Sequence, residues 1–138
     1  MFKVILFFSV LFLISSLLNA SVIEKEAELK IITWNQLFGS GENLLLKKIR
    51  LTAFYTDGGF HKDSESAYEF SSEYLVFPFH GDITENFINR CSHKLLIVEG
   101  VIHSHEVSRA PRIKKVSRLS PVSEPEFDCL AQIVDFKS

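Results

Sequence analysis

The chain has 138 residues, of which 46% are hydrophobic and 23% are charged, with a formal net charge of −2 and a mean hydropathy of +0.15. This length corresponds to about one domain of roughly 150 residues, and the composition excludes intrinsic disorder, a collagen and a multi-domain enzyme. The negative charge argues against a nucleic-acid binder, because such proteins use a surplus of basic residues to neutralise phosphates.

Residues 1–20 are predicted to be a secretory signal peptide. Fifteen of them are apolar, and Lys3 is the only charge before an uncharged run that ends at Leu18. A basic start, a short apolar stretch and a small residue at the cut are typical of such signals, and the run is shorter than the ~20 residues that span a bilayer. We expect cleavage after Ala20, which leaves residues 21–138 as one periplasmic or secreted domain without stable membrane insertion. Retention as an anchor is the alternative, since Leu18 is an unusual residue three positions before the cut.

The next segment, residues 22–38, is predicted to be one amphipathic helix followed by a short tight segment, because its apolar residues recur at spacings of three and four. The β-branched run at residues 31–33 weakens the second half as a helix. An extended Lys30–Thr33 followed by one helical turn at Trp34–Phe38 is therefore an equal alternative.

Four strands are predicted further along the chain. Their alternating or continuous apolar patterns span Lys47–Tyr55, Tyr74–Phe79, Lys94–His103 and Ile113–Val122. Gly100 interrupts the third of these segments, and a glycine inside a strand indicates a bulge or a sharp bend.

The segments between these strands carry loop and helix signals. Residues 60–72 are polar and are predicted to form a loop or hairpin end. Asp82–Arg90 is predicted to be a helix capped by Asp82, and residues 124–136 are predicted to form a C-terminal helix. The basic cluster Arg109–Arg118 is typical of a solvated strand edge, with a partner-binding patch as the alternative.

The predicted order is an N-terminal segment, two or three strands, a helix, two strands and a tail helix, which indicates a mainly β protein with short helices. A helix between the third and fourth strands of a small bent barrel is the order found in the OB fold. We therefore expect one OB-like domain with its core at about residues 31–122, and an α+β sandwich is the alternative.

Cys91 and Cys129 are the only two cysteines, and both lie in the part expected to be exported. An even count in an oxidising compartment predicts one disulfide. This bond would stabilise the fold by roughly 3–4 kcal/mol by closing a loop of about 38 residues. Two buried free thiols are the alternative.

Four short segments follow one another in a recognisable order: Ile31-Ile-Thr-Trp34-x-x-Leu37, Lys48-Ile-Arg-Leu51, Glu73-Tyr-Leu-Val-Phe-Pro-Phe-His-Gly81 and Leu96-Ile-Val-Glu-Gly100. This pattern resembles a family of exported bacterial OB-like proteins of unknown function, with I-T-W-x-x-L, K-V-R-[IL], E-F-L-L-V-P-Y-F-G and V-x-G-x segments. The resemblance implies an exported OB-like domain and no particular activity. The family continues with Cys-Ile-His-Val-Pro where this chain has Asp82-Ile-Thr-Glu85, so a metal-related role of that stretch is not carried over.

Two groups of residues are candidate binding sites. His103 and His105 lie on one face at the end of a strand, since side chains there repeat every two residues, and could form a zinc or copper site with nearby histidines or a glutamate. Surface histidines are the more common explanation of such a pair. Among the aromatic residues, Phe54, Phe60 and Trp34 could line an OB binding face, where rings stack on bases or sugars. Packing in the barrel core is the alternative for these rings.

The expected function is a non-catalytic binding or interaction module of the cell envelope, for example an inhibitor or immunity-type protein with an envelope protein as partner. Its alternatives are an oligosaccharide- or nucleic-acid-binding OB module and a small envelope metalloprotein or hydrolase. We expect no enzymatic activity, no cofactor and no nucleic-acid partner. The sequence has no G-x-S-x-G, S-x-x-K or H-E-x-x-H motif and no glycine-rich phosphate loop.

Overall fold

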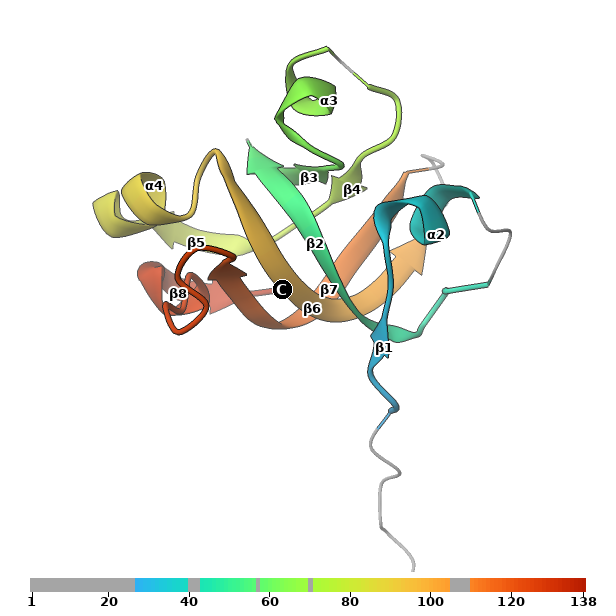
Figure 1. The fold of residues 1–138 in the computed structure, drawn as a ribbon. Helices are drawn as coiled ribbons and strands as arrows, with labels where there is room; N and C mark the ends of the chain where they lie inside the picture. The colour runs from blue at the N-terminus through green and yellow to red at the C-terminus, as the bar shows by residue number, and fades with distance from the viewer. Residues whose placement is uncertain (1–26, 40–42, 57, 70, 105–109) are drawn as a thin grey trace, which may run out of the picture.

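The fold is taken from a computed structural model that describes residues 27–39, 43–56, 58–69, 71–104 and 110–138 (Figure 1). The predicted signal peptide and its cleavage after Ala20 lie outside these residues, as does His105.

Five strands close into a barrel: β2 (Lys48–Thr56), β3 (Gly59–His61), β4 (Leu75–Val76), β6 (Lys94–Ser104) and β7 (Pro111–Pro121). The ring runs β2-β3-β4-β7-β6 and closes because β6 also pairs with β2. All of these pairings are antiparallel except that between β4 and β7. The helix α4 (Glu85–Arg90) lies between the third and fourth barrel strands in the chain. This connectivity confirms the predicted OB-like barrel and argues against the sandwich.

Shorter elements surround the barrel. The strand β1 (Lys30–Ile31) runs parallel to β2 and leads into the helix α2 (Trp34–Gly39). The alternative interpretation of the N-terminal segment, extended chain followed by a helical turn, is therefore confirmed for residues 30–38. The helix α3 (Ser64–Tyr68) stands beside β3 and β4 at one end of the barrel, within the segment predicted to be a loop (Figure 1).

The core follows from the alternation of side chains along the strands. On β2, Ile49, Leu51, Ala53 and Tyr55 point inward and are at most 4% exposed. The ring of Tyr55 meets three buried phenylalanine rings at centroid distances of 5.4–6.3 Å, namely those of Phe60, Phe77 and Phe87. Each large side chain buried in this way stabilises the fold by about 1.5–3 kcal/mol.

Gly100 is the point at which β6 bends, as predicted. The register between β6 and β7 shifts between Glu99 and Val101. A Cβ atom at Gly100 would lie 2.7 Å from Cγ1 of Ile113 and 2.9 Å from the carbonyl oxygen of Lys114. The two strands can therefore approach this closely only when residue 100 has no side chain.

The predicted C-terminal helix over residues 124–136 is wrong. This segment forms turns, a 3₁₀ turn η1 (Leu130–Gln132) and the strand β8 (Ile133–Lys137). The strand β8 pairs with β5 (His80–Ile83) in a small second sheet. Pairing with a distant strand thus overrides the local helical periodicity.

The helix predicted at Asp82–Arg90 begins later than expected. Asp82 belongs to β5, and Thr84 caps α4 because its Oγ1 accepts a hydrogen bond of 3.2 Å from the backbone N–H of Phe87. The helix ends at Cys91, whose sulfur lies 2.12 Å from that of Cys129, with the Cα atoms 6.1 Å apart. The two cysteines predicted to pair thus have the geometry of a disulfide, which joins the end of α4 to the residue before η1.

We expect Gly100→Ala to lower the free energy of unfolding by about 1–3 kcal/mol, because the added methyl group would overlap β7. Guanidinium denaturation followed by circular dichroism measures this loss. Gly39→Ala is the matched control, since a Cβ at Gly39 would meet nothing within 4 Å. Equal stability of the two variants would contradict the close approach of β6 and β7.

Reduction of the disulfide should also destabilise the fold. Opening the 38-residue loop returns conformational entropy to the unfolded chain and should cost roughly 3–4 kcal/mol. Denaturation of the same protein with and without a phosphine reductant, after mass spectrometry of the oxidised chain, measures this difference. A chain that carries two free thiols when purified from an oxidising compartment would overturn the assignment.

Candidate functional site

A hollow on the outside of the barrel lies where OB folds bind their ligands. In OB folds the binding surface is formed by the second and third barrel strands and by the loops beside them, which are β3, β4 and the β2–β3 turn in this chain. The hollow has a volume of about 480 Å³, within the range of about 300–1,000 Å³ typical of small-molecule sites. We call it the barrel-face pocket, and its lining residues are Thr56, Gly58, Gly59, His61, Ala67, Tyr74, Val76 and Arg112.

The floor of the barrel-face pocket follows from the two-residue period of the strands. Phe60 and Leu75 point into the core and are fully buried. Their neighbours His61, Tyr74 and Val76 therefore point outward. The register pairs Val76 of β4 with Gly59 of β3 on one side, and a glycine at this position leaves the floor open.

The third strand of the floor is β7, which contributes Arg112. The single register pair between β4 and β7 joins Val76 to Arg112. On its other side Arg112 faces His103 of β6. The next residue of β7, Ile113, is fully buried in the core, so the alternation of the strand places the arginine side chain on the outside.

The helix α3 forms one wall of the barrel-face pocket through Ala67. The helix is capped by Asp63, whose Oδ1 accepts hydrogen bonds from the backbone N–H and the hydroxyl of Ser66 at 2.8 and 2.6 Å. Both bonds lower the pKa of Asp63, and the bond from the Ser66 hydroxyl has the larger effect. At the other end of α3, the hydroxyl of Tyr68 lies 3.2 Å from Nδ1 of His93. The first turn of this short helix is therefore capped by its own segment, and its last residue is tied to the distant residue His93.

Two nitrogen atoms in the pocket are buried without a hydrogen-bond partner among the described residues. They are Nδ1 of His61 and Nε of Arg112. The ring of Tyr74 stacks on that of His61 at a centroid distance of 6.4 Å and an interplanar angle of 29°, and is 38% exposed. Burial lowers the pKa of His61 below 6.5, so the imidazole is neutral at pH 7 and offers one donor and one acceptor nitrogen. The pocket thus presents one fixed positive charge, one neutral imidazole and one partly exposed aromatic face.

The aromatic residues predicted as ligand contacts do not form this site. Phe60 is fully buried in the core, and Trp34 is 6% exposed and packs on Phe38 with ring centroids 4.8 Å apart. The prediction that Phe60 could line a binding face is therefore wrong, and its alternative, packing in the barrel core, holds because Phe60 points inward from β3. Phe54 is half-buried on the outer face of β2, where its ring meets Tyr68 edge-on at 6.4 Å.

Of the three side chains that give the barrel-face pocket its chemistry, His61 was not predicted as a site residue. Arg112 belongs to the basic cluster Arg109–Arg118, for which a partner-binding patch was the alternative, and Tyr74 is one of the aromatic residues that could line an OB binding face. The signal that could have found His61 is its position next to the core residue Phe60, on a strand that the OB order places beside that of Tyr74.

The predicted metal site is not assembled within the described part of the chain. No group of three or more histidine, cysteine, aspartate or glutamate side chains there could hold a metal ion. His103 lies on β6 opposite Arg112. Glu99 forms an ion pair of 2.7 Å with Arg50, and Nδ1 of His93 faces the hydroxyl of Tyr68.

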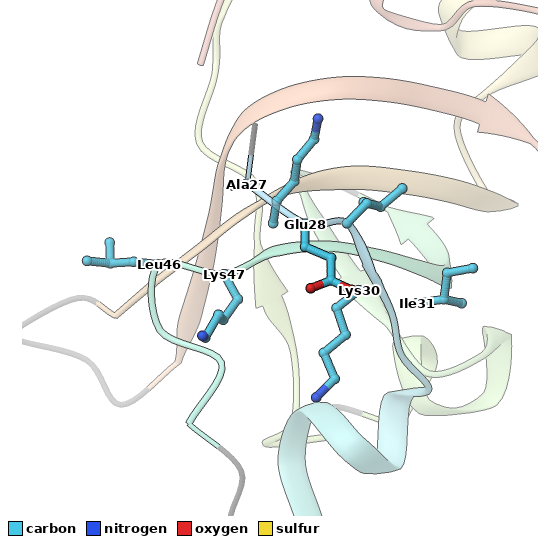
Figure 2. A pocket seen from close by; sticks show the side chains of 8 residues that line it. Ala27, Glu28, Lys30, Ile31, Leu46 and Lys47 are labelled. Carbon is cyan, nitrogen blue, oxygen red and sulfur yellow. The ribbon is translucent and has the colours of Figure 1, made fainter. Parts of the chain in front are cut away.

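A second hollow lies between the N-terminal segment and the start of β2 and has a volume of about 820 Å³ (Figure 2). It is lined by residues 27–31 and 46–48. Figure 2 shows Leu46 and Ile31 pointing to opposite sides, and these side chains are 62% and 69% exposed. Because two of its lining residues are apolar, largely exposed and point apart, we take the barrel-face pocket as the better candidate site.

Comparison of the chain with models of known protein families, with curated proteins and with solved structures finds no match. The resemblance to exported OB-like proteins therefore stays a prediction. Among the described residues, no helix is long and apolar enough to cross a membrane.

We expect NMR titration of the histidine ring signals to give His61 a pKa below 6.5, because burial disfavours the imidazolium. Between that pKa and 6.5 the unfolded chain binds more protons at this residue than the folded chain. The free energy of unfolding should therefore rise with pH across this interval. His61→Gln should remove this contribution, and an unchanged pH dependence in the variant would contradict the burial of the ring.

Proposed function

We propose that this chain is an exported, non-catalytic binding module that holds one unit of an oligosaccharide in the barrel-face pocket. The observation that carries the proposal is a hollow on the OB binding surface, lined by the partly exposed ring of Tyr74 and by His61 and Arg112, each of which has a buried nitrogen without a partner among the described residues. A buried donor without a partner costs about 1–3 kcal/mol. A ligand that supplies the missing acceptors recovers this free energy on binding.

The shape of the site favours a small ligand unit over a protein partner. A stable protein interface buries about 800 Å² on each partner and is centred on apolar or aromatic anchors. The barrel-face pocket is instead a concave site of about 480 Å³ with few polar groups, which is the form of a small-molecule site.

The net charge of the chain argues against a nucleic acid. Glu65, Glu69 and Glu73 are exposed, on or beside α3 and before β4. Removal of the predicted signal with Lys3 would change the formal net charge of the chain from −2 to −3. A chain of phosphates would meet net repulsion here, whereas a sugar unit would not.

Two observations support the export and the non-catalytic role that we propose. A Cys91–Cys129 disulfide is compatible with an oxidising compartment, in agreement with the predicted signal peptide. The described lining residues of the barrel-face pocket include no carboxylate, cysteine or lysine that could act with His61 as a catalytic pair. The set of groups suits recognition through hydrogen bonds and stacking.

NMR titration of the 15N-labelled protein with chito-, cello- and galacturonic oligosaccharides tests the proposal. We expect at least one of them to shift the signals of His61, Tyr74 and Arg112 together. Val76→Trp should abolish the shifts by filling the pocket, whereas Thr52→Trp, at an exposed position on β2, should not. Shifts confined to other surfaces, or none at millimolar concentrations, would contradict an oligosaccharide site here.

A further inference from the structure

The described arginines differ in one respect that bears on the ligand. Arg50 and Arg118 both approach Oε1 of Glu99, at 2.7 and 3.7 Å, and Arg90 pairs with Glu124. Arg112 is the only arginine in the described ranges without a carboxylate partner, and it is half-buried. A partly desolvated guanidinium without a counter-charge is unfavourable, and the arginine keeps its proton at every physiological pH.

We propose that the barrel-face pocket selects a sugar that carries a single carboxylate, which pairs with the guanidinium of Arg112 while the sugar ring lies against Tyr74. This inference rests on the proposed function and narrows it to acidic sugars. A guanidinium and a carboxylate match in geometry, since two parallel N–H groups donate to two oxygens. Nε of Arg112, buried and unpartnered, belongs to that fork.

The strand neighbours of Arg112 among the described residues leave its guanidinium without a counter-charge. Val76 lies beside it on β4 and His103 on β6, and neither can supply a negative charge. The third polar group of the pocket, His61, can donate one hydrogen bond to the second carboxylate oxygen or to a hydroxyl of the sugar.

The number of charges favours one carboxylate over a phosphate. Burial favours the neutral form of His61, and Arg112 is the only arginine or lysine among the described lining residues. A dianionic phosphate would therefore be compensated by one positive charge only, whereas a monoanion is matched.

The test compares methyl β-D-glucuronide with methyl β-D-glucoside, which differ in the C6 carboxylate alone. NMR titration of the full chain should show about tenfold to hundredfold tighter binding of the glucuronide, with shifts centred on Arg112 and Tyr74. Arg112→Gln should remove this preference. Lys114→Gln is the matched control, because it removes one positive charge from an exposed position on the same strand and should keep the preference.

A readout on the unaltered protein covers the case in which Arg112→Gln does not fold. The bound carboxylate should raise the pKa of His61 towards its ordinary value, since a nearby negative charge favours the imidazolium. The glucoside should leave that pKa unchanged.

Three results would overturn the inference. Equal binding of both glycosides in the pocket would leave the proposed oligosaccharide site standing but would remove the role of the carboxylate. Tighter binding of glucose 6-phosphate than of the glucuronide would show that the pocket prefers a phosphate. Tighter binding of a short oligothymidylate would assign the surface to single-stranded nucleic acid, and with it the proposed function would fail.

Discussion

The close contact between β6 and β7 at Gly100 is the constraint on which the rest of the structure depends. On one edge β6 pairs with β2 through residues 94–101. On its other edge it pairs with the second half of β7 before the register shift and with the first half of β7 after it. A small barrel closes only if some strand bends sharply enough to pair with both neighbours. The missing side chain at position 100 lets β6 do so without pushing Ile113 out of the core.

The same bend creates the barrel-face pocket. Once β6 has turned, the start of β7 reaches β4, where the pair Val76–Arg112 completes the ring. β4 is two residues long, so this closing contact is short and its outer side is not covered by a further strand. The helix α3, which connects β3 to β4, lies beside this point and turns the uncovered surface into a hollow (Figure 1). The residues that join β4 to β7 in the closed barrel, Val76 and Arg112, therefore also line the candidate site.

Local sequence patterns predicted the features that depend on residues close together in the sequence. The alternation on β2, the bend at Gly100 and the OB order of the barrel strands were all accessible in this way. The C-terminal strand β8 was not, because the apolar residues Phe127, Leu130 and Val134 recur at helical spacings. Only the pairing of Ile133 and Val134 with β5 makes this segment a strand. Phe60 was misplaced for a related reason, since its polar neighbours indicated a loop whereas the short strand β3 turns it inward.

The polar groups of β7 show why the candidate site could not be predicted from charge alone. Arg112 and Arg118 lie six residues apart on one strand and look alike in the sequence. Arg118 lies opposite Glu99, whose carboxylate it shares with Arg50 across three adjacent strands. Arg112 lies between Val76 and His103, where no described carboxylate pairs with its guanidinium. The register of the barrel, and not the residue type, thus makes one arginine a structural partner and leaves the other available for a ligand.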